Sequence, residues 1–221
     1  MASQQHIDLS HPISEGLVTY PGLPEPRVST HLSREAAEEA YGPGVTFYIG
    51  VVEICTNTGT YLDVPFHRFA DGHDVAELAL DRVAAVPAVC IDGRGERAVD
   101  LAGVGPDRLE GHAVLVRTDH SQHFATDAYA VDAPYLTEGA AEALVAAGVA
   151  CVGIDSLNID NTDDLRRPVH TVLLRAGIPI IEHLRGLGGL PADGFTFTAV
   201  PPKIEGIGTF TVRAYATVPT A

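Results

Sequence analysis

The sequence predicts an α/β fold, with one domain over residues 1–221, a mixed β-sheet core and flanking helices. In the middle of the chain, apolar runs of strand length alternate with helix-like segments, which favours strands joined by helices. Two strand-like runs then follow each other near the C-terminal end with no helix between them, so the pattern is not a strict β-α repeat. With 46% apolar residues, 221 residues suffice for one substantial core.

The N-terminal part of the chain predicts short elements and turns. Residues 7–13 indicate a short strand closed by Pro12. We expect Ser10 and His11 to cap its end, since no third partner for a nucleophile is identifiable. Residues 33–42 have a serine N-cap and a glycine stop but little apolar periodicity, which predicts a short exposed helix or a mobile loop near the site entrance.

Polar groups cluster after residues 45–56, a run rich in β-branched and aromatic side chains that predicts a strand. Gly59 allows a sharp turn or a close approach to a ligand, and Pro65 stiffens the following loop. Asp63 and His67 are therefore expected on rigid, non-repetitive backbone that suits a functional site. The alternative is an ordinary glycine turn and proline-stopped loop with an incidental Asp and His.

The remaining elements follow from periodicity and capping residues. Thr137 is expected to cap an amphipathic helix that ends at Ala147 before Gly148, and Pro168 to start a second helix. We expect the helix that begins at Pro168 to stop at Gly177. Strands are expected over residues 83–91, 112–118, 149–155, 178–182, 195–200 and 210–218.

Composition excludes several classes of function. A net charge of −15 without any Lys/Arg cluster would repel nucleic acid and anionic lipid, so we expect neither as a partner. No segment approaches ~20 uninterrupted apolar residues and no leader-like segment opens the chain, so a cytoplasmic protein is expected. The three cysteines lie in separate apolar runs, which predicts buried thiols and no disulfide.

Residues 57–67 resemble the signature of the cyclase family of metal-dependent hydrolases, which includes kynurenine formamidase and isatin hydrolase. The signature reads His-x-Gly-Thr-His-x-Asp-x-Pro-x-His. This chain matches it at five positions and departs from it at two: Asn57 and Tyr61 stand where the family has two metal-binding histidines. The matching residues are Gly59, Thr60, Asp63, Pro65 and His67. The resemblance implies the swivelling β/α fold of the kynurenine formamidases.

Later segments extend the resemblance over nearly the whole chain. Residues 153–156 look like the family's Gly-Ile-Asp-Ser turn, and His170 and Glu182 look like its helix histidine and strand-end glutamate. The resemblance implies that Asp63, His170 and Glu182 can hold a second metal ion. It also implies that His67 is the general acid or base. The four candidate catalytic residues are thus Asp63, His67, His170 and Glu182.

The two departures bear on metal binding. A neutral Asn57 amide is a weak ligand for zinc, and Tyr61, with an ordinary pKa of ~10, would have to lose its proton to bind a metal well. We therefore expect no metal cofactor, with one Zn or Mn ion on Asp63, His170 and Glu182 as the alternative. Without a metal, Asn57 and Tyr61 are candidate substrate-binding donors to a developing oxyanion.

Three functions remain open. The first is a small-molecule enzyme that uses acid/base chemistry for ring closure, dehydration or rearrangement of a carbonyl-containing metabolite, with secondary metabolism as its expected setting. The second is a metal-dependent amide or lactam hydrolase of the arylformamidase type with a reduced ligand set. The third is a non-catalytic protein that binds a small molecule. Buried ionisable groups that serve no purpose are costly, which speaks against the third.

Other polar and aromatic residues have simpler expectations. Tyr20 and Phe47 are candidate substrate-facing aromatics, with core packing as the alternative. We expect His183 to point to the opposite side of its strand from Glu182. The remaining expectations are a surface loop for residues 119–123, a turn for His73, ion pairs for Lys203 and Arg213, and, from the family and the apolar content, a homodimer or homotetramer.

Overall fold

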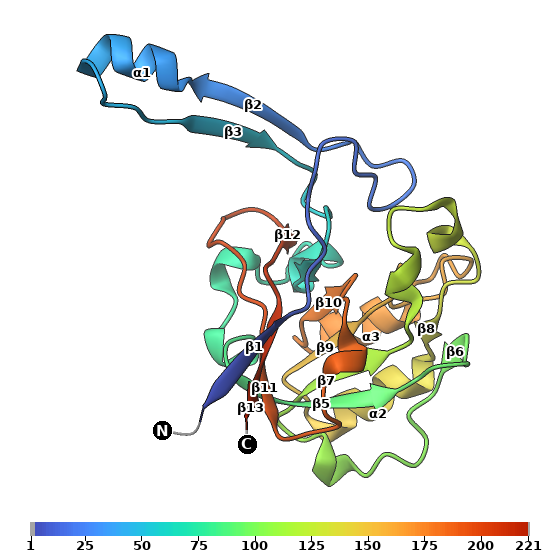
Figure 1. Cartoon of the computed structure of the whole chain (residues 1–221). Coiled ribbons are helices and arrows are strands. Elements are labelled where there is room, and N and C mark those ends of the chain that lie inside the picture. The colour runs from blue at the N-terminus through green and yellow to red at the C-terminus, as the bar shows by residue number, and fades with distance from the viewer. Residues whose placement is uncertain (1–2, 221) are drawn as a thin grey trace.

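A nine-stranded mixed sheet forms the centre of the molecule (Figure 1). The computed structural model describes residues 3–220. The strands of this sheet lie in the order β1, β13, β11, β5, β7, β9, β10, β4 and β12. Their bounds are β1 Gln4–Asp8, β13 Tyr215–Pro219, β11 Phe195–Thr198, β5 Val86–Asp92, β7 Ala113–Arg117, β9 Cys151–Ile154, β10 Ile180–Glu182, β4 Tyr61–Asp63 and β12 Thr209–Thr211.

The direction of the strands confirms the predicted mixed α/β sheet. The four central strands β5, β7, β9 and β10 run parallel to one another, whereas the outer strands pair antiparallel on both sides. Strands β7, β9 and β10 are almost wholly buried, as is usual for parallel strands covered on both faces. This arrangement gathers the carboxyl ends of β7, β9 and β10 at one edge, where the chain enters loops that carry polar residues.

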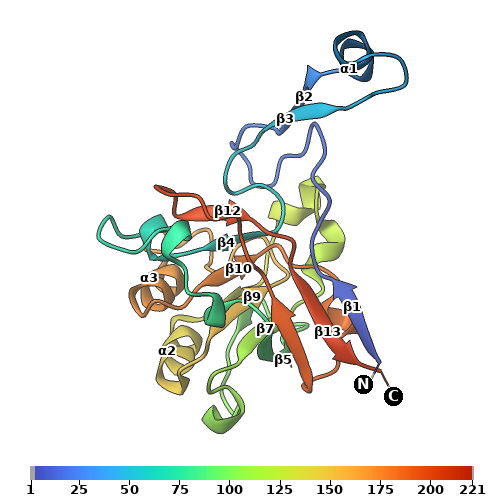
Figure 2. The ribbon, with the colours of Figure 1, turned by 90° about the vertical axis from the view of Figure 1, so that its left-hand side faces the viewer.

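Two helices cover one face of the sheet, and both begin and end as the sequence predicts (Figure 2). Helix α2 (Glu138–Ala147) starts at Thr137, whose Oγ1 accepts the Ala140 N–H, and ends at Gly148 in the left-handed region at φ 68°. Helix α3 (Pro168–Arg175) has its proline in the first turn. The helices pack on the strands through fully buried leucines such as Leu144 and Leu173. Over residues 3–220, no helix combines the length and apolar character needed to cross a bilayer.

The strand predicted over residues 45–56 is wrong in its extent and its place. Only β3 (Ile49–Glu53) is a strand there, and it pairs solely with β2 (Arg27–Leu32) outside the main sheet. The core strand of this region is instead β4, inside the signature itself, between β10 and β12. Apolar content alone misled the prediction, because the side chains of β3 are exposed rather than buried.

Strands β2 and β3 form an arm that carries helix α1 (Arg34–Tyr41) away from the rest of the molecule, as Figures 1 and 2 show. Ser33 caps α1 and Gly42 ends it, which confirms the predicted short helix. Its predicted position near the site entrance is wrong for a single chain, since α1 lies at the far end of the arm. The arm exposes eight large apolar side chains: Val28, Tyr41, Val45, Phe47, Tyr48, Ile49, Val51 and Val52.

The C-terminal strand predicted over residues 210–218 is two strands. Strand β12 pairs with β4, and β13 pairs with β1 and β11 on the other side of the sheet. At the break, Ser10 Oγ accepts the Ala214 N–H at 2.7 Å, which gives Ser10 the structural role expected of it. Arg213 forms the expected ion pair, at 2.8 Å from Asp8. Lys203 forms no ion pair with any residue in 3–220.

Two elements are absent from the sequence-based prediction. Strands β6 (Ala98–Val99) and β8 (Tyr135–Leu136) form a small separate parallel sheet. They are only two residues long, so neither produces a periodic pattern that the sequence could reveal. Short 3₁₀ turns supply most of the remaining regular structure, among them Pro65–His67 and His120–His123.

Candidate functional site

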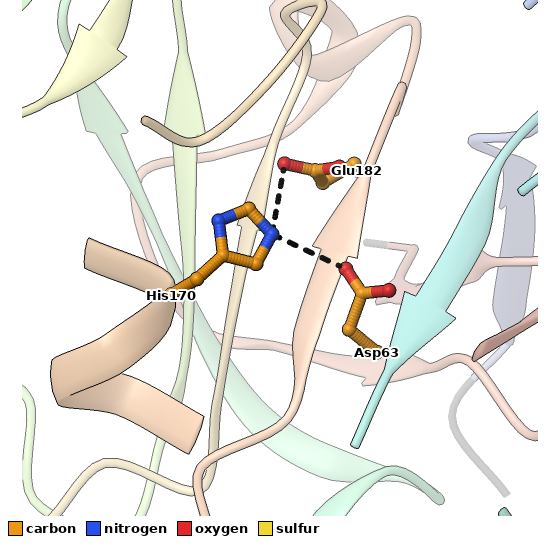
Figure 3. A group of neighbouring side chains, drawn as sticks. All are labelled: Asp63, His170 and Glu182. Atoms are coloured by element: carbon orange, nitrogen blue, oxygen red, sulfur yellow. Dashed lines mark ion pairs between the residues drawn. The ribbon is translucent and has the colours of Figure 1, made fainter. Parts of the chain in front are cut away.

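Three of the four candidate catalytic residues come together in a buried group (Figure 3). The Nε2 atom of His170 lies 3.7 Å from Asp63 Oδ2 and 3.7 Å from Glu182 Oε1. One ligand atom from each residue lies within 4.8 Å of the other two. Asp63 is more than a hundred positions before His170 and Glu182 in the chain, so the fold itself assembles the group.

The register of the sheet explains the assembly. In the antiparallel pair of β4 and β10, Tyr61 lies opposite Glu182 and Asp63 opposite Ile180. Directly opposite residues share one face of a sheet, and so do residues two apart along a strand. Tyr61, Asp63 and Glu182 therefore point to one face. Helix α3 packs on that face and adds His170 from its first turn.

Asp160 holds His170 in place, a role that the sequence analysis missed. Its carboxylate accepts the backbone N–H groups of Val169 at 2.7 Å and His170 at 3.0 Å, and it lies 2.6 Å from His170 Nδ1. It thereby caps α3, whose preceding residue Arg167 provides no side-chain cap. The available signal was an aspartate in the polar loop just before a proline-started helix.

Tyr61 and the backbone at Ile159 hold Glu182. The Tyr61 hydroxyl donates to Glu182 Oε2 at 2.5 Å, and the Ile159 N–H donates to Oε1 at 2.6 Å. Burial, followed by the charges of Glu182 and Asp63, raises the pKa of Tyr61 well above its usual value, so the phenol keeps its proton. Tyr61 is thus a hydrogen-bond donor to Glu182 rather than an anionic metal ligand.

The histidine and the glutamate have shifted pKa values. Burial raises the pKa of Glu182 to about 7, against the opposing charge of His170. For His170, burial lowers the pKa, but the hydrogen bond to Asp160, the Asp63 carboxylate 3.7 Å away and the charge of Glu182 outweigh it and raise the pKa to about 10. Without another cation in the group, the imidazole is therefore charged at neutral pH.

Asp63 is the least satisfied member of the group. It is fully buried, and neither of its carboxylate oxygens has a hydrogen-bond partner among residues 3–220. Three carboxylates, from Asp63, Asp160 and Glu182, surround a single imidazole, so His170 alone leaves negative charge uncompensated. Buried charges without partners are costly, on the order of several kcal/mol each.

A divalent cation would meet this need. Carboxylate oxygens and an imidazole nitrogen are ligands that Zn²⁺ and Mn²⁺ accept, and a carboxylate on the other ring nitrogen, here Asp160, is the usual support of a ligand histidine. The residues therefore fit one ion held by Asp63, His170 and Glu182.

The two residues that replace the family's histidines serve as hydrogen-bonding groups. Tyr61 binds Glu182 as described, and the Asn57 side-chain oxygen accepts from Thr209 Oγ1 at 3.0 Å and Thr56 Oγ1 at 3.1 Å. The bond from Thr209 connects Asn57 to β12. Asn57 itself is half-buried.

His67 lies beside the buried group but outside it. Its ring centroid is 5.9 Å from that of His170, and the side chain is exposed at the end of the Pro65–His67 turn. The backbone of Gly208 passes so close that a Cβ there would lie 2.2 Å from the His67 nitrogen. Only glycine fits at this position, and the tight contact fixes the turn that presents His67.

The other candidates lie elsewhere. Phe47 is exposed on the arm, with its ring 5.6 Å from Tyr41, and a single chain does not bring it to the group. Tyr20 is half-buried, and its side chain forms no hydrogen bond with the described residues. His120, expected in a surface loop, is buried and lies 2.9 Å from the Tyr129 carbonyl oxygen. His73 is half-buried, and its carbonyl oxygen accepts the Phe66 N–H, as a turn residue can.

The expectation for His183 is wrong. It follows β10 in the left-handed region, at φ 55°, so the alternation of a strand does not set its direction. Its ring lies 5.1 Å from that of Tyr61, and its Nδ1 lies 2.8 Å from the Tyr129 hydroxyl. His183 therefore adjoins Tyr61, and through it the buried group.

A mixed α/β sheet with a buried Asp-His-Glu group at strand and helix ends defines a class of small α/β enzymes with a candidate metal centre. Comparison with known proteins gives the family. Residues 7–161 match the family model described as putative cyclase, and the chain belongs to this cyclase family. Among curated proteins, it is 29% identical over 185 residues to a kynurenine formamidase of Bacillus mycoides, covering 83% of this chain and 84% of the relative.

Solved structures agree with this assignment. Isatin hydrolase A from Ralstonia solanacearum superposes with a TM-score of 0.79 at 25% identity, over 97% of this chain and 92% of that one. A structure described as a potential metal-dependent hydrolase with cyclase activity gives a TM-score of 0.77 at 26% identity, over 99% and 100% of the two chains. These names are those of enzymes that act on small molecules, which supports an enzymatic role here.

The opposite pKa shifts of two buried histidines can be measured by NMR titration of the imidazole carbons in EDTA. His170 should remain charged at pH 8, since its pKa is raised to about 10, whereas His183 should remain neutral at pH 5, since burial lowers its pKa to about 3. Single His→Gln variants assign the signals.

The same shift links His170 to stability in metal-free protein. A folded pKa above the ordinary 6.5 gives a contribution that is complete below pH 6.5 and is lost as the pH rises toward 10. The free energy of unfolding of the wild type should therefore fall across this range relative to His170→Gln. Equal pH profiles for the two proteins, or a His170 that titrates near 6.5, would contradict the charged arrangement.

Proposed function

We propose that this chain is a hydrolase that opens an amide or lactam bond of a small carbonyl-containing molecule with the help of one divalent metal ion. The observation that carries this proposal is Asp63, whose two buried oxygens lack partners beside His170 and Glu182. The names of the relatives, kynurenine formamidase and isatin hydrolase, support an aryl formamide or a fused aromatic lactam as the substrate class.

Each residue of the site has a task in this reaction. Asp63, His170 and Glu182 would hold the ion, which when bound supplies a positive charge for the substrate carbonyl and acidifies water. Asp160 keeps the His170 Nδ1 proton, so that Nε2 is free to bind, and Tyr61 fixes the Glu182 carboxylate. These two contacts preorganise the ligands before substrate arrives.

His67 is the candidate for proton transfer. It is exposed, lies 5.9 Å from His170 between ring centroids, and carries no hydrogen bond from its ring to any residue in 3–220. An imidazole there can take a proton from the attacking water and return it to the departing nitrogen. The fixed turn at Gly208 supports this role because it restricts where the ring can lie.

A second function has an observation in its favour. The pKa of Glu182 near 7 and the charged His170 form an acid/base pair that needs no metal, because the imidazolium itself compensates part of the carboxylate charge. Such a pair suits ring closure, dehydration or rearrangement of a carbonyl compound. The uncompensated carboxylate oxygens of Asp63 make the metal-assisted hydrolase the better supported of the two.

We also propose that the protein is a homo-oligomer, at least a dimer, held together by the arm. A two-stranded ribbon exposed on both faces is marginally stable alone in water, and this one carries four of the eight exposed apolar side chains of the arm. Covering those side chains on two arms would hide roughly 1,000–1,500 Å², close to the ~1,200–2,000 Å² of stable interfaces. Such an interface would also bring the exposed Phe47 into contact with the other subunit.

Mutation of the proton-transfer candidate tests the proposed chemistry. With an N-formyl aryl amine and isatin as substrates, His67→Ala should lower kcat by about 10²–10⁴-fold with little change in KM, since proton transfer acts in the transition state. Glu182→Gln should lower it comparably, and EDTA should abolish wild-type turnover of both compounds.

His73→Ala and His123→Ala are the matched controls, and both should retain near-normal rates because neither ring approaches the buried group. Full turnover by His67→Ala would exclude its role. Wild-type activity that persists in EDTA would exclude the metal-assisted reaction and leave the acid/base enzyme.

Charge placed on the arm tests the oligomer. Val28 and Val52 lie opposite each other on β2 and β3, so the double change to lysine should put two charges in the proposed interface and separate the subunits. Light scattering should then report about one 23.3 kDa chain, against two or more for the wild type. Leu80→Lys, at an exposed site on the body, is the control and should not change the mass. A monomeric wild type would contradict the proposal.

A further inference from the structure

Arg185 is a cation with no partner, placed between two surface grooves. Its side chain forms no hydrogen bond or ion pair with any residue in 3–220. It lines a groove of about 730 Å³ and a second of about 650 Å³, and both grooves also include His11 and Pro12. Arg185 is exposed, so its positive charge is accessible to a ligand in either groove.

The nearby carboxylates are already neutralised by other arginines. Asp119, which lines the larger groove, accepts two hydrogen bonds from Arg117, at 2.7 and 3.0 Å. Asp8, which lines the smaller one, accepts two from Arg213, at 2.9 and 2.8 Å. In both pairs the guanidinium donates two hydrogen bonds to the carboxylate. This geometry is more specific and stronger than a single hydrogen bond. The positive charge of Arg185 is therefore left for a group outside the chain.

His11 supplies a second polar atom without a partner. Its Nε2 is buried and forms no hydrogen bond with the described residues, and burial followed by the charge of Arg185 lowers the pKa of the ring to about 4. The neutral ring stacks on Phe124, with centroids 3.7 Å apart and planes 12° apart. Both side chains line the larger groove, which thus combines a cation with the two stacked rings.

We propose that this larger groove binds a small aromatic carboxylate. Arg185 would pair with the carboxylate in a fork geometry, and His11 and Phe124 would contact the ring. The groove is distinct from the buried Asp-His-Glu group: neither Asp63, His170 nor Glu182 lines it. The inference therefore stands whether or not the proposed hydrolysis is correct. The ligand is either a substrate or product of this enzyme or a separate metabolite.

Benzoate is the probe, and its neutral analogue benzamide is the matched control ligand. Titration of the full-length protein, followed by amide chemical shifts in NMR, should show saturable benzoate binding and at least tenfold weaker binding of benzamide. Arg185→Gln should weaken benzoate binding at least tenfold. Arg108→Gln, which removes another exposed arginine that lines neither groove, should leave it unchanged.

The remaining outcomes are equally decisive. Benzoate binding that survives Arg185→Gln but is lost in Asp63→Asn would place the ligand at the buried group and overturn the proposal, as would equal binding of benzoate and benzamide or none at all. If Arg185 is required, competition with a turnover substrate identifies the ligand as substrate or product, and its absence identifies a separate metabolite. Both of these results support the groove as an anion site.

Discussion

The burial of three carboxylates around one imidazole is the interaction on which the rest of the site depends. Asp63, Asp160 and Glu182 are all nearly inaccessible to solvent, and His170 is the one basic side chain among them. Removing so much charge from water is unfavourable unless it is compensated by hydrogen bonds and by cations. Backbone N–H groups satisfy Asp160, and Tyr61 and a backbone N–H satisfy Glu182, so the deficit is concentrated on Asp63.

The sheet is what makes this arrangement possible. Strand β4 inserts antiparallel between β10 and β12, which brings the signature residues to the edge where β10 ends and α3 begins. Because opposite residues share a face, one register places Tyr61, Asp63 and Glu182 together. A one-residue slip of β4 would turn Tyr61 and Asp63 away from Glu182, so the short strand pairing is as important to the site as the side chains themselves.

Sequence reasoning captured the sheet type, the two packed helices with their caps and the resemblance that pairs Asp63 with His170 and Glu182. It failed where tertiary context decides: residues 45–56 look like a core strand but form an exposed arm, and His183 leaves the strand in a left-handed conformation. Asp160 was missed because a capping aspartate in a polar loop looks like any other. The local sequence pattern does not reveal which elements pack against a residue.

The central claim is that Asp63, His170 and Glu182 hold one divalent ion despite the loss of two family histidines. Elemental analysis of protein purified without chelators tests it most directly. The wild type should contain about one Zn or Mn ion per chain, Asp63→Asn close to none, and the exposed control Asp81→Asn the wild-type amount. Wild-type protein without bound transition metal, which also takes up none when Zn²⁺ or Mn²⁺ is added, would contradict the account.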